Sequence, residues 1–239
     1  MALPQFRPMI LNRKLILFLL LLAQFALFAQ PYNVTDEKGR KQGPWRKYFA
    51  EGTLRYEGTF KDNVEVGEFI FYYPDGVVAA RKVFDGTTGN CTATMYHLNG
   101  KVASTGRYIG DKKDGEWIFY NEEELLLSKE NFKLGLREGN SETYHTNGTL
   151  AKLVIYKIDV PQGQWIEYYD NGTIKARCTF KDGKFHEVYE AYSSDGKMIE
   201  KGMYNDGLKE GFWIVYDENG RPKTKETYKK GKLVSTEDL

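Results

Sequence analysis

The side chains that could carry catalytic or metal chemistry are few in this chain. The 239 residues include three histidines, His97, His145 and His186, and two cysteines, Cys91 and Cys178. Imidazole nitrogens and thiolates bind zinc at about 2.0–2.3 Å, and a thiolate beside an imidazole can act as a nucleophile. No two of these residues have the short spacing of a metal-binding motif. We therefore expect no metal, no cofactor and no enzyme activity.

The other side chains with binding chemistry are large aromatics that recur at a fixed interval. Every tryptophan belongs to one column of positions 24 residues apart, which is filled by Trp45, Phe69, Ala93, Trp117, Ser141, Trp165, Tyr189 and Trp213. An exposed row of such rings could stack on glycan rings or hold apolar side chains of a partner. The candidate binding residues are Trp45, Phe69, Trp117, Trp165, Tyr189 and Trp213. The alternative is that the column packs between neighbouring repeats as core, and Ala93 and Ser141 interrupt the row.

The elements that must position these rings are repeats of 24 residues. Each of the eight positions of the column lies three residues before a tyrosine. These tyrosines are Tyr48, Tyr72, Tyr96, Tyr120, Tyr144, Tyr168, Tyr192 and Tyr216. A glycine follows each tyrosine by four residues except at Glu124, and a further aromatic follows it by twelve. Eight units therefore occupy residues 43–234, with an N-terminal flank at 30–42 and a tail at 235–239.

Each unit has the pattern of two strands joined by turns. Asn-Gly or Asp-Gly after the tyrosine, as at Asn171-Gly172, predicts a tight turn in which both central residues have positive φ. A second glycine near the end of the unit predicts a second turn. A hairpin of this size cannot bury enough apolar surface alone, so neighbouring units must stack. The sequence predicts an all-β fold: an elongated open antiparallel sheet of about eight stacked hairpins.

Two features depend on this arrangement. Stacked strands would hold His97 and His145 ~19 Å apart, which excludes joint metal binding, and we expect His186 in a turn. Cys91 and Cys178 would lie ~33 Å apart, beyond the ~7 Å between Cα atoms that a disulfide allows. The glycine missing at Glu124 predicts either an acidic docking knob or a locally altered loop.

The start of the chain has the pattern of an export signal. Basic residues precede an apolar run from Leu15 to Ala29, and no acidic residue occurs before Asp36. The run of about 15 residues is shorter than the ~20 that a transmembrane helix needs. We expect residues 1–29 to be a signal peptide and the protein to be exported to the periplasm or the extracellular space. Retention of the segment as an anchor is the alternative.

The net charge of the chain limits the classes of partner that it can attract. The chain has 34 Lys+Arg and 33 Asp+Glu, so it has no excess charge with which to attract nucleic acid. Charged residues lower the mean hydropathy of the chain everywhere except at its start, which excludes a polytopic membrane protein.

The unit resembles the bacterial variant of the MORN-repeat family. Its clearest copy runs from Gly163 through Trp165 and Tyr168 to Asn171 and Gly172. The resemblance implies a hairpin array that serves as an interaction or scaffolding module without catalysis. Many bacterial relatives are described as YwqK-like antitoxins, and eukaryotic relatives are associated with membrane lipids and protein assemblies. We expect an exported scaffold that binds a protein or cell-envelope polymer, with contact to lipid head groups open. The alternative is a YwqK-like antitoxin that acts by protein binding.

Overall fold

A computed structural model describes residues 31–239, and the predicted signal peptide at 1–29 lies outside the described residues. The described part of the chain contains eighteen strands. They are β1 (Val34–Thr35), β2 (Lys41–Tyr48), β3 (Leu54–Lys61), β4 (Val64–Tyr72), β5 (Val78–Phe84), β6 (Cys91–Tyr96), β7 (Val102–Ile109), β8 (Lys112–Tyr120), β9 (Leu126–Lys133), β10 (Leu136–Tyr144), β11 (Leu150–Lys157), β12 (Val160–Tyr168), β13 (Ile174–Lys181), β14 (Lys184–Tyr192), β15 (Met198–Asn205), β16 (Leu208–Tyr216), β17 (Pro222–Lys229) and β18 (Lys232–Asp238).

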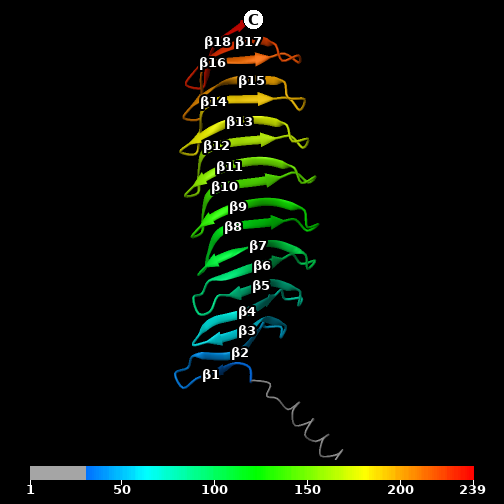
Figure 1. Cartoon of the computed structure of the whole chain (residues 1–239), viewed down its shortest axis with the longest axis vertical. Coiled ribbons are helices and arrows are strands. Elements are labelled where there is room, and N and C mark those ends of the chain that lie inside the picture. Colours follow the sequence, from blue (N-terminus) through cyan, green and yellow to red (C-terminus); the bar gives the residue numbers. More distant parts are fainter. Residues whose placement is uncertain (1–30) are drawn as a thin grey trace, which may run out of the picture.

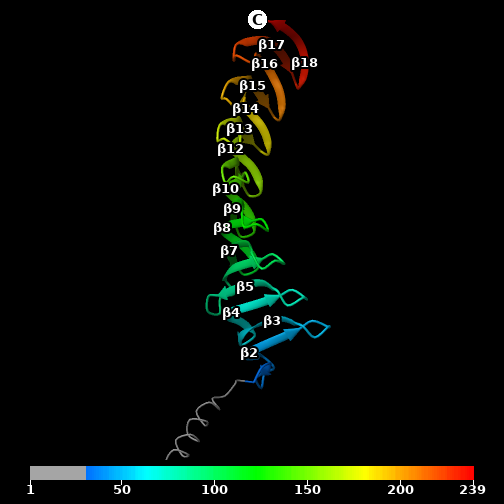
Figure 2. The same cartoon turned by 90° about the vertical axis from the view of Figure 1, so that its right-hand side faces the viewer.

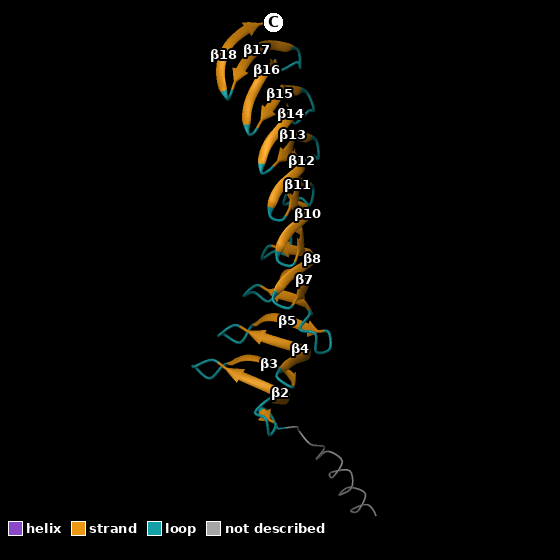
Figure 3. Ribbon diagram, turned by 90° about the vertical axis from the view of Figure 1, so that its left-hand side faces the viewer, coloured by secondary structure: helices purple, strands orange, loops and turns teal. Residues whose placement is uncertain are grey.

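Each strand pairs antiparallel with the next strand in the chain, which confirms the predicted open antiparallel sheet. The hairpins stack one above another into an elongated array whose strands run across the long axis (Figure 1). Viewed from the sides, the strands bow, so that each hairpin is curved (Figures 2 and 3). Between residues 31 and 239 no helix is long and apolar enough to cross a membrane.

The turns after the tyrosine column form one long edge of the array, on the right in Figure 1, which we call the long-turn edge. In one of them the N–H of Tyr73 donates to the Val77 carbonyl at 2.8 Å, and the N–H of Gly76 donates to the Tyr73 carbonyl at 2.9 Å. Of the residues between, only Gly76 has positive φ, at +88°. The prediction of two positive-φ residues is wrong here, because the connection has three residues rather than two.

The turn at Glu124 keeps the same geometry. The N–H of Asn121 donates to the Leu125 carbonyl at 3.0 Å, and Glu124 adopts the glycine conformation at φ +68°. The prediction of an altered loop is therefore wrong, since the turn is retained with a glutamate in left-handed backbone.

The opposite edge consists mostly of two-residue turns, and we call it the tight-turn edge; the connections at residues 36–40 and 85–90 are longer. Asp62 and Asn63 both have positive φ, at +52° and +70°, between the paired residues Lys61 and Val64. The turns at residues 158–159 and 182–183 have the same form. These connections match the right-handed twist of the strands they join, as mirror-image turns do.

A bulge explains the glycine that precedes six of the eight tyrosines by five residues. Thr59 pairs with Val66 and Glu57 with Ile70, so β4 has extra residues opposite Gly58. Gly67 lies in this bulge with φ +67°. In the unit with Cys91 at this position, β5 and β6 pair without a register shift, so there is no bulge.

The core lies on one face of the sheet, which we call the tryptophan face. Trp213, Trp117 and Phe69 are 0%, 1% and 1% exposed. Each ring lies on a glycine of the preceding strand, so that a Cβ added at Gly202 or Gly106 would come closer than 3.0 Å to the ring. Further aromatics surround the rings, as where Tyr204 packs edge-on against Trp213 with ring centroids 5.0 Å apart. The bulge places each of these three rings over a glycine, where no Cβ occupies the space.

The column of eight tyrosines faces the other way, on what we call the tyrosine face. Side chains alternate between the two faces along a strand. Phe69 and Phe71 stack together on the tryptophan face. Tyr72 instead donates its hydroxyl hydrogen bond to Glu57 at 2.8 Å.

Candidate functional site: exposed apolar clusters on a rigid array

The predicted binding row divides into buried and half-buried positions. Phe69, Trp117 and Trp213 are buried, and lysine side chains cover two of these rings, with Lys209 Nζ 3.8 Å from the Trp213 centroid and Lys113 Nζ 4.5 Å from that of Trp117. A ligand cannot stack on a ring without exposed surface. At these three positions the rings therefore pack between neighbouring repeats as core. Trp45, Trp165 and Tyr189 are half-buried, and a binding role for them stays a prediction.

The gap in the row at Ala93 is filled by the chain itself. The glycine that lies beneath Phe69, Trp117 or Trp213 is replaced by Lys82 in the strand before Ala93. The Lys82 ammonium lies 4.8 Å from the Tyr108 centroid and 5.6 Å from that of Phe71. A long side chain thus occupies space left by the missing ring.

The histidines and cysteines have structural positions. Nε2 of His97 lies 3.0 Å from the Tyr120 carbonyl oxygen, and Nε2 of His145 lies 3.0 Å from that of Tyr168, so both link one long turn to the next repeat. His186 is in strand β14, and its predicted place in a turn is wrong. Both cysteines are free and buried. Among residues 31–239 no three His, Cys, Asp or Glu side chains are grouped for a metal ion.

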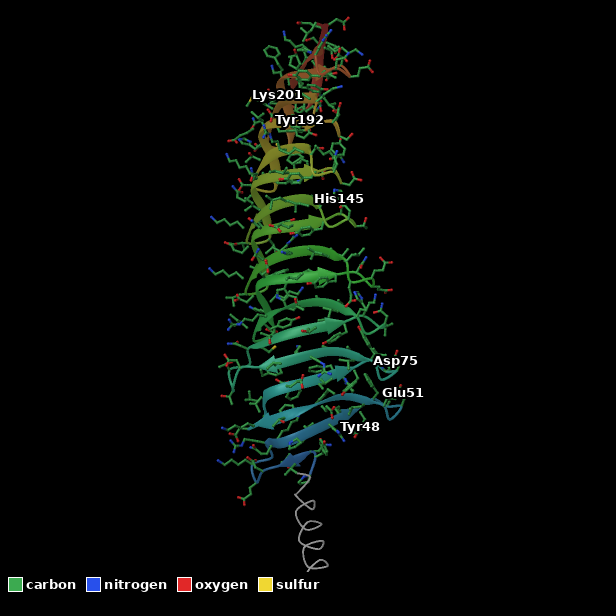
Figure 4. All side chains as sticks on the ribbon, turned by 45° about the vertical axis from the view of Figure 1, so that its right-hand side comes forward. Tyr48, Glu51, Asp75, His145, Tyr192 and Lys201 are labelled. Atoms are coloured by element: carbon green, nitrogen blue, oxygen red, sulfur yellow. The ribbon has the colours of Figure 1, made fainter. Side chains whose placement is uncertain are left out.

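A charged network organises the tyrosine face of the C-terminal half. The buried Glu190 carboxylate lies 2.6 Å from Arg177 Nη2 and 3.0 Å from Lys201 Nζ, and accepts a hydrogen bond from the Tyr192 hydroxyl at 3.0 Å. Burial alone would raise the pKa of Glu190, but the hydrogen bonds from Lys201, Arg177 and Tyr192 together hold that pKa below its ordinary value. Tyr192 and Lys201 lie close together in Figure 4. The network fixes side chains from three successive strands.

Beside this network lies an exposed apolar cluster, which we call the Phe212 cluster. It consists of Val188, Met203 and Phe212, which are 44%, 52% and 63% exposed. Val188 and Met203 are direct cross-strand partners on β14 and β15. Val188 and Phe212 immediately precede Tyr189 and Trp213, so they point to the tyrosine face. Lys225 Nζ lies 4.6 Å from the Phe212 ring centroid, which places a positive charge at the margin.

A hollow of about 330 Å³ adjoins Met203. It is lined by His186, Glu187, Met203, Tyr204, Asn205, Glu210 and Gly211. Glu187 occupies the bulge position with φ +67°, where most other repeats have glycine. A non-glycine residue in this conformation costs free energy and often marks a functional position. The cluster and hollow together can accept an apolar side chain beside a carboxylate and an imidazole.

A second apolar cluster lies on the tight-turn edge. Leu134, Leu136, Ile158 and Val160 are each about half exposed, and they come from two consecutive turns in the middle of the array. Neither cluster was found from the sequence, because both occupy columns that are polar or mixed in the other repeats. Comparison of each unit with its neighbours at these columns would have revealed them.

Comparison with solved structures finds low similarity. A TcdB2-TccC3-Cdc42 complex matches over 80% of this chain and 11% of that chain, with 11% identity and a TM-score of 0.24. A TcdB2-TccC3 structure matches over 80% and 12%, with 10% identity and a TM-score of 0.19. The chain therefore spans about a tenth of these two proteins. A porin-like protein from Bacteroides uniformis matches over 86% and 97%, with 9% identity and a TM-score of 0.21. No curated protein matches.

Comparison with protein families gives a match to the MORN repeat variant at residues 41–62, 65–85, 137–157, 161–182 and 209–230. The three units that are not matched are those that lack a repeat glycine, with Cys91, Glu124 or Glu187 in its place. These repeats are generally non-catalytic and form scaffolds for protein or membrane interaction. On these five matches, and on the sheet of stacked hairpins in which they lie, the chain belongs to the MORN repeat variant family.

Proposed function

We propose that the protein is an exported, non-enzymatic scaffold that holds a protein partner on the tyrosine face of its last repeats. The observation that carries the proposal is the Phe212 cluster, whose three side chains are exposed on adjacent strands, Phe212 by 63%. Burial of apolar surface contributes about 25 cal/mol per Å², and an aromatic anchor with an adjoining hollow is typical of the energetic centre of an interface. A cell-envelope polymer is the alternative occupant.

The array supports this role because it holds the cluster rigidly. The three side chains are on adjacent strands β14, β15 and β16, and the Glu190 network fixes the backbone beside them. A preformed site loses little conformational entropy on binding. The near-zero net charge of the chain supports a protein partner over nucleic acid.

Crosslinking in envelope extract should identify the partner, and its affinity should then be measured with purified components. We expect Phe212→Ala to weaken binding at least tenfold without lowering the melting temperature, since an exposed ring supports no core. Val83→Ala is the matched control, because Val83 is half exposed at the position in repeat 2 that corresponds to Met203. Equal affinity of Phe212→Ala and the native protein would show that the cluster is not the site.

Export is part of the proposal and has its own test. The basic residues and apolar run before Gln30 support it. We expect Gln30 as the first residue of protein purified from the native host. An intact Met1 in the cytosolic fraction would instead favour a YwqK-like antitoxin, which must meet its toxin inside the cell.

A further inference from the structure

On the tight-turn edge, two bulky residues occupy turn positions with positive φ, which is an unfavourable backbone conformation for them. Leu134 and Ile158 stand at the first position of their two-residue turns with φ +49° and +51°. A β-branched side chain such as that of Ile158 is rare at positive φ, because its Cβ substituents crowd the backbone. The corresponding positions in other repeats are Asp62, Gly110, Asp182, Asp206 and Lys230. Both apolar side chains are also exposed, Leu134 by 50% and Ile158 by 61%.

The adjoining residues extend the apolar surface. Leu136 and Val160 begin the strands that leave these turns, and each is more than two-fifths exposed. The Val160 side chain leans toward the following turn, since its Cγ1 would lie 3.7 Å from a Cβ at Gly183. Leu134, Leu136, Ile158 and Val160 thus form one surface along the edge, which we call the turn-tip patch.

The backbone holds the patch in place. The N–H of Ile158 donates to Glu138 Oε2 at 2.8 Å, and the N–H of Asp159 donates to the Arg137 carbonyl at 3.0 Å. Arg137 Nε also donates to Asp159 Oδ1 at 3.0 Å. At the other tip the N–H of Leu134 donates to Asp114 Oδ1 at 3.2 Å. Because these backbone groups are already bonded, an added strand could not pair there.

The rim of the patch carries exposed lysines and a small excess of positive charge. Exposed lysines precede both tips and occupy the adjoining turns, at Lys112, Lys133, Lys157, Lys181 and Lys184. The acidic side chains nearest the tips, Asp114, Glu138 and Asp159, accept the hydrogen bonds just described but keep their negative charge. With Asp111 and Asp182 on the outer turns they offset all but one of the positive charges of the five lysines and Arg137. A partner with acidic flanks is complementary to this rim.

The spacing of the tips fits a helix. Leu134 and Ile158 are one repeat apart, which is two strand spacings or ~9.6 Å. Residues i and i+7 of an α-helix are ~10.5 Å apart along its axis and lie on one face. We propose that the turn-tip patch docks an amphipathic helix of a protein partner, which lies along the array with apolar residues toward the patch and acidic residues on both flanks. This surface is separate from the Phe212 cluster, so the scaffold has two docking surfaces.

The test uses the full chain and a fluorescent synthetic helix with Leu at i, i+3, i+4 and i+7 and Glu on its flanks. Binding is measured by anisotropy. The double variant with Leu134→Asp and Ile158→Asp has at both tips the aspartate that three other repeats have at this position. We expect it to bind the helix at least tenfold more weakly while it unfolds at the same or a higher temperature, because the strain at both tips is reduced.

Controls separate the patch from its surroundings. Leu208→Asp changes a half-exposed leucine on the same edge of repeat 7 and should leave helix binding unchanged, as should Phe212→Ala. A peptide of the same composition with scrambled leucines should bind at least tenfold more weakly. Any of three results would overturn the proposal: no binding of the helix up to ~1 mM, equal binding by the double variant, or a dimer of the native chain that the double variant abolishes.

A membrane surface is the other possible occupant. If the native chain binds phosphatidylserine vesicles, the double variant does not, and the helix does not bind, the patch is assigned to a membrane surface and the proposal is overturned. Failure of the helix to bind leaves the Phe212 test unaffected, because the two surfaces share no residue.

Discussion

At the scale of single residues, the glycine beneath each large ring is as much a part of the core as the ring. Phe69 lies on Gly58, Trp117 on Gly106 and Trp213 on Gly202. A single-layer sheet has no second layer to cover an aromatic side chain. The ring can be buried only when it lies flat on the neighbouring strand, and this requires a residue without Cβ.

This pairing predicts a coupled pair of substitutions. Gly202→Ala should destabilise the protein by about 1–3 kcal/mol through overpacking, and Trp213→Ala by about 3–5 kcal/mol through lost burial. In the double variant the alanine at 202 meets no ring, so its own cost should largely disappear. Urea unfolding of the four proteins gives the interaction energy. If Gly202→Ala costs the same with and without Trp213, the ring and the glycine are not packed as described.

The sequence showed the column of rings but not which way it faced. The tryptophan and tyrosine columns differ by an odd number of residues, so their opposite faces could be predicted if the strand was regular. Burial of Trp213 depends on the bulge at Gly211 and on Gly202, which is eleven residues away in another strand. One signal was available: glycine stands eleven residues before Phe69, Trp117 and Trp213, whereas Lys82 and Glu130 stand before Ala93 and Ser141.

At the scale of the turn, side chains couple one repeat to the next. Nδ2 of Asn147 donates to the Asp170 carbonyl at 2.8 Å, and Nδ2 of Asn171 donates to the Ser194 carbonyl at 2.8 Å. Within its own turn, Asn147 Oδ1 accepts from the N–H of Thr149 at 3.0 Å. Asparagine therefore recurs at this position because it stabilises its own turn and reaches the following one. Sequence patterns within one turn cannot show the second contact.

The two roles of Asn147 can be separated by one substitution. Asn147→Asp keeps the oxygen that accepts from Thr149 but removes the donor to Asp170. We expect a loss of about 0.5–1.5 kcal/mol and faster hydrogen exchange in the turn at residues 169–172, since that turn loses an external contact. Thr146→Ala, an exposed change in the same turn, serves as the control. Unchanged exchange at 169–172 in Asn147→Asp would contradict a coupling between turns.

At the scale of the whole molecule, the array is a chain of nearest-neighbour contacts. Every strand from β2 to β17 pairs with the strands before and after it in the sequence. This arrangement was predictable because a 24-residue period without insertions leaves stacking as the way to bury each unit. The exposed clusters were not predictable in the same way, since they depend on departures from the repeat at Phe212, Leu134 and Ile158.

Nearest-neighbour stacking makes the repeat a removable unit. Deletion of residues 163–186 removes one period, and we expect a shorter folded array that loses the stability of one interface. Deletion of residues 163–174 removes half a period and joins strands of the wrong kind, so it should unfold at a clearly lower urea concentration. Circular dichroism during urea titration distinguishes the two. Coincident unfolding midpoints would mean that 24 residues are not the structural unit.

The orientation of the strands has a mechanical consequence. Because they lie across the long axis (Figure 1), the hydrogen bonds between them point along it. A pull on the two ends of the array loads these bonds one ladder at a time, and hairpins detach singly from an end while the rest stay folded. A repeat that occupies ~9.6 Å of the array becomes a chain of roughly 80 Å when it is extended. A pull on its two ends would therefore lengthen the array in steps of one repeat.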